Sequence, residues 1–92
     1  MKSILSDEER CYLCGSTTNL ETHHIFFGTA LRPIADKHGF KVKLCLICHR
    51  DQKRGAHGNR EMDLKLKRDC QKAYEKKHNR EDWMKIIGRN YL

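Results

Sequence analysis

Two pairs of cysteines with two-residue spacing constrain this chain more than any other feature. The first pair is Cys11 and Cys14, and the second pair is Cys45 and Cys48. A C-x-x-C turn brings two sulfur atoms within reach of one metal ion, and two such turns supply the four thiolates of a closed tetrahedral zinc site. We therefore expect a structural zinc ion at these cysteines, with no coordination position left for a substrate.

The length and composition of the chain give such a zinc site a large part in stability. The chain has 92 residues, of which 38% are hydrophobic and 34% charged, so its apolar core is small. Domains of this size often need a metal ion or disulfides to remain folded. We expect a single domain over residues 1–92, in which zinc supplies much of the folding free energy.

The cellular compartment decides whether the cysteines bind metal or form disulfides. The first ten residues lack the apolar stretch of a secretion signal, and the chain has no apolar run of about 18 residues that would cross a membrane. We expect a cytoplasmic location, where paired cysteines are metal ligands rather than disulfides. The alternatives are a redox pair or buried thiols. The fifth cysteine, Cys70, has no partner in the sequence pattern and is expected to be a core thiol.

The pattern of apolar and polar residues predicts an α+β fold. Alternation predicts strands over 20–26 and 40–44, joined by a long connection with a helical turn after Pro33. A short helix is expected to begin at Cys48, and a helical turn capped by Ser6 is expected in the first ten residues. Apolar spacings of three and four predict a helix over 61–77, and Asn79 is expected to cap a last helix over 80–87.

Four histidines lie where they could form a second, open metal site. His23 and His24 are adjacent on a predicted strand and therefore point to opposite faces. This suggests a division of roles, in which one binds a cation and the other acts as a base. The zinc site fixes the start of the helix that carries His49, which brings His49 beside His23. His57 is expected to be the third ligand, with Lys53 as the competitor for that place through a phosphate contact.

The combination of these pieces resembles the zinc-stapled HNH endonucleases, whose core is a ββα-metal (His-Me) finger. The resemblance covers residues 11–58 and leaves 60–92 as a C-terminal helical segment. It implies that His23 and His49 bind a catalytic divalent ion and that His24 is the general base. The short length and the C-terminal end also resemble small phage and prophage HNH proteins.

The sequence departs from the HNH pattern in the connection between the strands. Many family members carry an asparagine there, which orients the base. The only asparagine within residues 15–48 is Asn19, before the histidine pair. The group that orients His24 is therefore unassigned, and a backbone carbonyl could serve.

The resemblance implies hydrolysis of DNA phosphodiester bonds, by nicking or by double-strand cleavage, with low sequence specificity. The catalytic ion would be Mg²⁺, Mn²⁺, Ni²⁺ or Zn²⁺. Two other functions remain open. One is a non-catalytic zinc finger that binds nucleic acid, and the other is a nuclease that acts on RNA or only with a partner protein.

The charge of the chain agrees with a nucleic-acid partner. Its net charge is +7 and its pI is near 9.3, and basic domains bind phosphate backbones through release of counterions. Double-stranded DNA is the expected partner, and no binding to a membrane is expected. The expected location is the cytoplasm of a bacterial or phage-infected cell. Phage or host DNA-processing proteins could also bind, and the chain is expected to be a monomer or a homodimer. The residues expected to contact phosphates are Lys41, Lys43, Arg50, Lys53 and Arg54.

Overall fold

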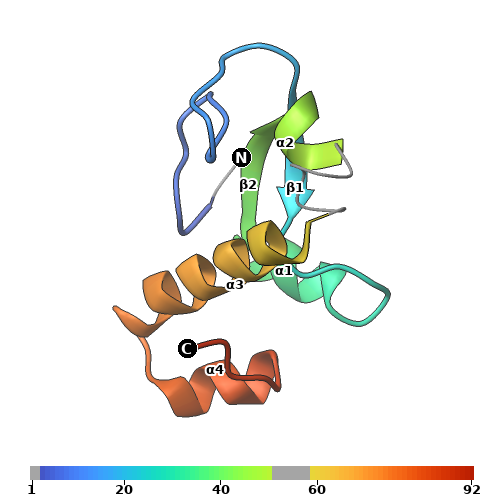
Figure 1. The fold of residues 1–92 in the computed structure, drawn as a ribbon. Coiled ribbons are helices and arrows are strands. Elements are labelled where there is room, and N and C mark those ends of the chain that lie inside the picture. The colour runs from blue at the N-terminus through green and yellow to red at the C-terminus, as the bar shows by residue number, and fades with distance from the viewer. Residues whose placement is uncertain (1–2, 51–58) are drawn as a thin grey trace.

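The computed structural model describes residues 3–50 and 59–92. A two-stranded antiparallel sheet combines with helices, which confirms the predicted α+β class. None of the helices in the described residues is long and apolar enough to cross a lipid bilayer. In chain order the elements are β1 (Leu20–His24), α1 (Arg32–His38), β2 (Lys41–Cys45), α2 (Leu46–Arg50), α3 (Arg60–Glu75) and α4 (Arg80–Ile86) (Figure 1).

The hairpin of β1 and β2 sets the faces on which functional side chains lie. Its register places His23 opposite Val42 and His24 opposite Lys41. The first strand is shorter than predicted, and the second is shifted by one residue. The connection between them contains a complete helix, α1, rather than a single turn. Pro33 favours its first turn and Gly39, with φ 74°, ends it in the left-handed conformation.

The first cysteine turn is attached to the hairpin through its backbone. The Tyr12 N–H donates to the Lys43 carbonyl over 2.8 Å, and Gly15, with φ 81°, closes the turn onto the Cys11 carbonyl. The predicted helical turn after Ser6 is wrong, because no helix forms within residues 3–10. An isolated turn costs more to nucleate than its single hydrogen bond returns.

The two C-terminal helices begin at asparagine caps. The Asn59 side chain accepts hydrogen bonds from the Glu61 and Met62 backbones, and the Asn79 side chain accepts one from Asp82. Helix α3 begins one residue before the predicted start and ends two residues before the predicted end. The predicted cap at Asn79 is confirmed.

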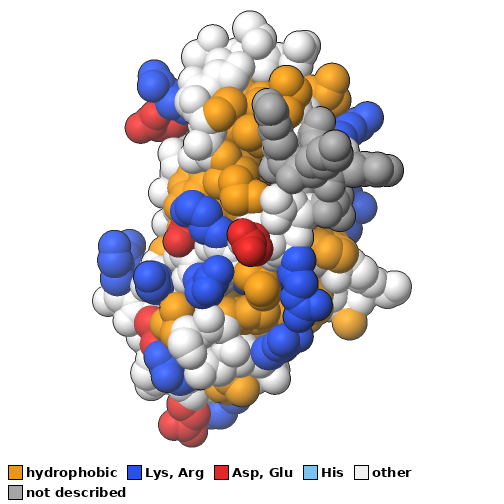
Figure 2. Space-filling model, viewed as in Figure 1, with side chains coloured by type: hydrophobic (Ala, Val, Ile, Leu, Met, Phe, Trp, Pro, Cys, Tyr) orange, Lys and Arg blue, Asp and Glu red, His pale blue; other side chains and the backbone are white. Residues whose placement is uncertain are grey.

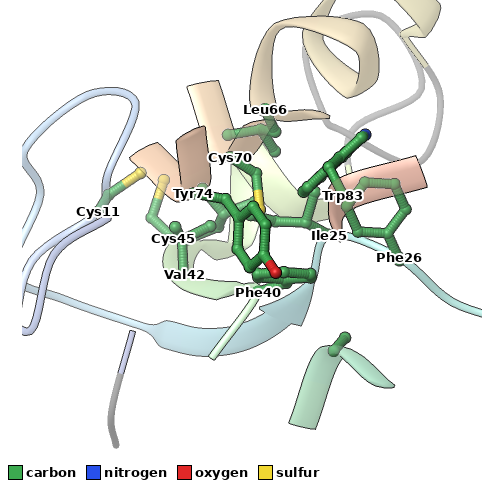
Figure 3. Close-up of a cluster of buried hydrophobic side chains, with 12 residues drawn as sticks. Cys11, Ile25, Phe26, Phe40, Val42, Cys45, Leu66, Cys70, Tyr74 and Trp83 are labelled. Atoms are coloured by element: carbon green, nitrogen blue, oxygen red, sulfur yellow. The ribbon is translucent and has the colours of Figure 1, made fainter. Parts of the chain in front are cut away.

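The hydrophobic core joins the hairpin to α3 and α4, which lie below it in Figure 1. Trp83 of α4 is completely buried and lies within 5.4–5.7 Å, between ring centroids, of Phe26, Phe40 and Tyr74. These rings and the Cys70 thiol form one cluster of buried side chains (Figure 3). The prediction that Cys70 is a core thiol is therefore confirmed.

Candidate metal centre and histidine cleft

The four predicted cysteines come together at one end of the hairpin. All four sulfur atoms lie within 4.8 Å of one another, and the Cys14 and Cys45 sulfurs are 3.5 Å apart. Zinc–sulfur bonds of about 2.3 Å in a tetrahedron require sulfur separations of about 3.8 Å. The cluster therefore fits a structural metal ion such as zinc, and four thiolates would complete its coordination.

The electrostatics of the cluster favour a bound cation. Burial raises the pKa of the Cys11 thiol, but backbone hydrogen bonds from Cys45, Cys14 and Leu13 outweigh this and lower it to about 6. At Cys48, burial and the neighbouring thiols raise the pKa well above its ordinary value. Four thiolates in this space repel one another unless a divalent cation neutralises them, so metal binding should release protons.

His23 and His49 lie side by side, as predicted from the sequence. The His23 side chain is on the core face of β1, with 1% of its surface exposed. Its ring centroid is 5.1 Å from that of His49, and the planes meet edge to face at 71°. Helix α2 follows β2 without a loop, so the junction that carries Cys45 and Cys48 also fixes His49. The third expected ligand, His57, lies outside the described residues.

Glu21, to which the sequence analysis gives no role, holds His49 in place. Its Oε1 lies 3.0 Å from His49 Nδ1, and Arg50 donates to Oε2 over 2.6 Å. The hydrogen bond from His49 lowers the pKa of the Glu21 carboxyl, and the charge of Arg50 lowers it further. A carboxylate only accepts, so the proton of neutral His49 lies on Nδ1 and the lone pair on Nε2. Carboxylates hold metal-binding histidines in this way in many proteins.

Asp36, which also has no role in the sequence analysis, holds His24 on the opposite face of the hairpin. Its Oδ1 lies 2.8 Å from His24 Nε2 and also accepts from Lys41 over 3.3 Å. The hydrogen bonds from His24 and Lys41 lower the pKa of the Asp36 carboxyl. Because a carboxylate only accepts, this contact selects the neutral tautomer of His24 that has its proton on Nε2 and its lone pair on Nδ1. The side chain that contacts the His24 ring is a carboxylate from α1, within the connection where the HNH pattern has asparagine.

One cleft is lined by His23, His24 and His49, the three predicted site histidines that the structure describes. The cleft has a volume of about 200 Å³. Arg32, at the start of α1, adds an exposed guanidinium to its wall. The His23 and His49 imidazoles reach the cleft from the core side of the hairpin. The His24 imidazole and the Arg32 guanidinium reach it from the side of α1. The other two lining residues are Thr22 and Phe27.

Of the residues predicted to contact phosphates, the three that the structure describes already have partners within the chain. Lys41 contacts Asp36, Lys43 donates to the Thr22 hydroxyl over 3.3 Å, and Arg50 contacts Glu21. Lys41 and Lys43 lie on the hairpin face of His24. Lys53 and Arg54 lie outside the described residues. On the face in Figure 2, Lys and Arg side chains are numerous over α3 and α4.

Comparisons of the chain with protein-family models, with curated proteins and with solved structures find no match.

Proposed function

We propose that this protein is a metal-dependent endonuclease that hydrolyses DNA phosphodiester bonds, with a chemistry like that of the HNH family. The observation that carries the proposal is the cleft in which His23, His24 and His49 meet. The imidazoles of His24 and His49 each have a ring nitrogen held by a carboxylate, which is common at metal and catalytic sites.

His23 and His49 are the proposed ligands of the catalytic ion. Their rings lie on the same side of the hairpin, and the Glu21 contact leaves the lone pair of neutral His49 on Nε2. A divalent ion bound here would supply a Lewis acid that stabilises charge on the phosphate. The ion is Mg²⁺, Mn²⁺, Ni²⁺ or Zn²⁺, and His57 is the proposed third ligand.

His24 is the proposed general base. The Asp36 carboxylate accepts the Nε2 proton, so Nδ1 carries the lone pair that takes a proton from the attacking water. Asp36 therefore takes the orienting role that asparagine has in many HNH proteins. Arg32 lines the same cleft and is suited to a nonbridging oxygen of the scissile phosphate.

Cleavage of supercoiled plasmid DNA tests this proposal. Purified protein is incubated with Mg²⁺, Mn²⁺, Ni²⁺, Zn²⁺ or no added metal, beside His24→Ala. We expect nicked or linear product that requires added metal and falls by about 10²–10⁴-fold in the variant, the range that a general base contributes. Zinc content and the fluorescence of Trp83 serve as controls that the variant is folded.

Two results would contradict the proposal. Wild-type protein that binds DNA but cleaves it with none of the metals would point to a zinc-finger binding module. Cleavage by His24→Ala at the wild-type rate would remove His24 from the mechanism. The same assay with a single-stranded RNA substrate shows which polymer is preferred.

A further inference from the structure

A second hollow lies beside the histidine cleft and is larger than it. Its volume is about 590 Å³, and it lies between the N-terminal segment, α1 and the end of α3. Asp36, which holds His24, forms part of its wall. We call it the α1–α3 pocket, and its acidic and basic lining residues are Asp7, Asp36, Lys37, His38, Lys41, Lys77 and His78.

Lysines outnumber acids in the α1–α3 pocket. Lys41 is paired with Asp36, whose Oδ1 also contacts His24. Within residues 3–50 and 59–92, no carboxylate lies within ion-pair distance of Lys37 or Lys77. Lys37 lies in α1 and Lys77 in the turn after α3, and both line the same hollow, so the pocket presents positive charge from two sides.

Two histidines in the pocket are held by aromatic rings. His38 stacks on Phe40 with 5.4 Å between centroids, and His78 stacks on Tyr74 with 4.4 Å. Stacking occupies a ring face and leaves the ring edge, which carries both nitrogens, for hydrogen bonds. Burial lowers the pKa of His38, and the charges of Lys37 and His78 lower it further. The cations of the pocket therefore repel one another, and an anion would relieve this repulsion.

We propose that the α1–α3 pocket is a phosphate-binding site, which receives a backbone phosphate of the nucleic-acid strand whose scissile bond lies at His24. Lys37 and Lys77 supply the charge, and the edges of His38 and His78 supply directed N–H donors for the phosphate oxygens. We assign the ligand to the nucleic-acid strand because Asp36 both lines the pocket and contacts His24 of the cleft. This assignment rests on the proposed function. A small phosphorylated molecule would use the same groups.

Side-chain NMR of His38 and His78 tests the pocket directly. The whole protein, with one zinc ion per chain for the four-cysteine cluster and no metal added for the histidine cleft, is titrated with inorganic phosphate and then with a short thymidine oligonucleotide. We expect both ligands to shift the two imidazole signals and to raise both pKa values, since an anion stabilises the charged ring. The absence of cleavage under these conditions separates this test from the nuclease assay.

A pair of double variants provides the matched comparison. Lys37→Ala with Lys77→Ala removes two charges from the pocket, and Lys72→Ala with Lys76→Ala removes two exposed charges of α3 and its end that do not line it. For duplex DNA binding, the first pair should reduce the slope of log affinity against log salt by about one to two units. The second pair should leave the imidazole response to phosphate unchanged.

Three results would overturn the proposal or part of it. Unchanged imidazole signals at saturating phosphate would remove the site. Equal phosphate responses in the two double variants would remove the role of Lys37 and Lys77. A response to inorganic phosphate but not to the oligonucleotide would refute the strand assignment and identify a site for a small phosphorylated molecule. Plasmid cleavage that persists in each case would leave the proposed function intact.

Discussion

Loss of metal from the four-cysteine cluster should unfold the protein. A net stability of roughly 0.05–0.15 kcal/mol per residue gives about 5–14 kcal/mol for 92 residues. Structural zinc sites contribute apparent free energies of about 10–16 kcal/mol at neutral pH. The metal contribution is therefore as large as the whole net stability, and the metal-free chain should have no stable native state.

Trp83 offers a direct assay for this prediction. It is the only tryptophan, and it is completely buried against Phe26, Phe40 and Tyr74. Addition of a strong chelator should shift its emission to that of exposed tryptophan and abolish cooperative melting by circular dichroism. Restoration of zinc should reverse both changes. Cys14→Ser should lower zinc affinity and shift the transition to lower chelator concentrations.

Cys70→Ala is the matched control, because Cys70 is buried but lies outside the metal cluster. Removal of one buried sulfur should cost about 1 kcal/mol, or roughly 4–8 °C in melting temperature, without loss of zinc. The reasoning would be refuted by metal-free protein that retains native Trp83 emission and melts cooperatively at the wild-type temperature.

Four further predictions address single contacts. Glu21→Ala should weaken metal binding in the histidine cleft by about 10–100-fold, and Glu21→Gln by less because its amide oxygen still accepts from His49, as calorimetric titration will measure. Asp36→Ala should lower kcat for DNA cleavage about tenfold or more without changing KM, and Asp36→Asn should have a kcat between those of Asp36→Ala and the wild type. Equal effects on kcat and KM would contradict the orienting role of Asp36. Hydrogen bonds from Gln71 and Arg80 lower the pKa of Glu75 below 4.5. The Glu75 carboxylate therefore stabilises the fold above that pH, and this contribution disappears as the pH falls through the lowered pKa. In urea unfolding from pH 3 to 7, the free energy of unfolding of Glu75→Gln should depend less steeply on pH than that of the wild type. Asn79→Ala should cost about 1 kcal/mol through loss of the α4 cap, also by urea unfolding.

The sequence predicts the parts of the fold that depend on local patterns. The cysteine spacing predicts the four-sulfur cluster, and the alternation of apolar and polar residues predicts the two strands of the hairpin. Asn79, directly before the last helix, predicts the cap of that helix. The adjacency of His23 and His24 predicts that they lie on opposite faces, because side chains alternate along a strand. The position of His49 beside His23 follows from its attachment to the second cysteine pair.

The carboxylates that hold the histidines are harder to predict, because they depend on tertiary contacts. Glu21 reaches His49 only because α2 begins directly after β2 and crosses the core face of β1. Glu21 lies two residues before His23 on the same strand face, and this spacing could have predicted its contact with the site. Asp36 reaches His24 because the connection folds as α1, and a search for asparagine alone passes over it.

We propose that one small fold carries a closed metal site of four cysteines and an open site in the histidine cleft. Native mass spectrometry of zinc-saturated protein counts the bound ions directly. We expect two ions in the wild type, one in His49→Ala, and two in His78→Ala, because His78 lies outside the cleft. A single ion in the wild type, retained in His49→Ala, would contradict the open site and leave a zinc-stapled binding protein.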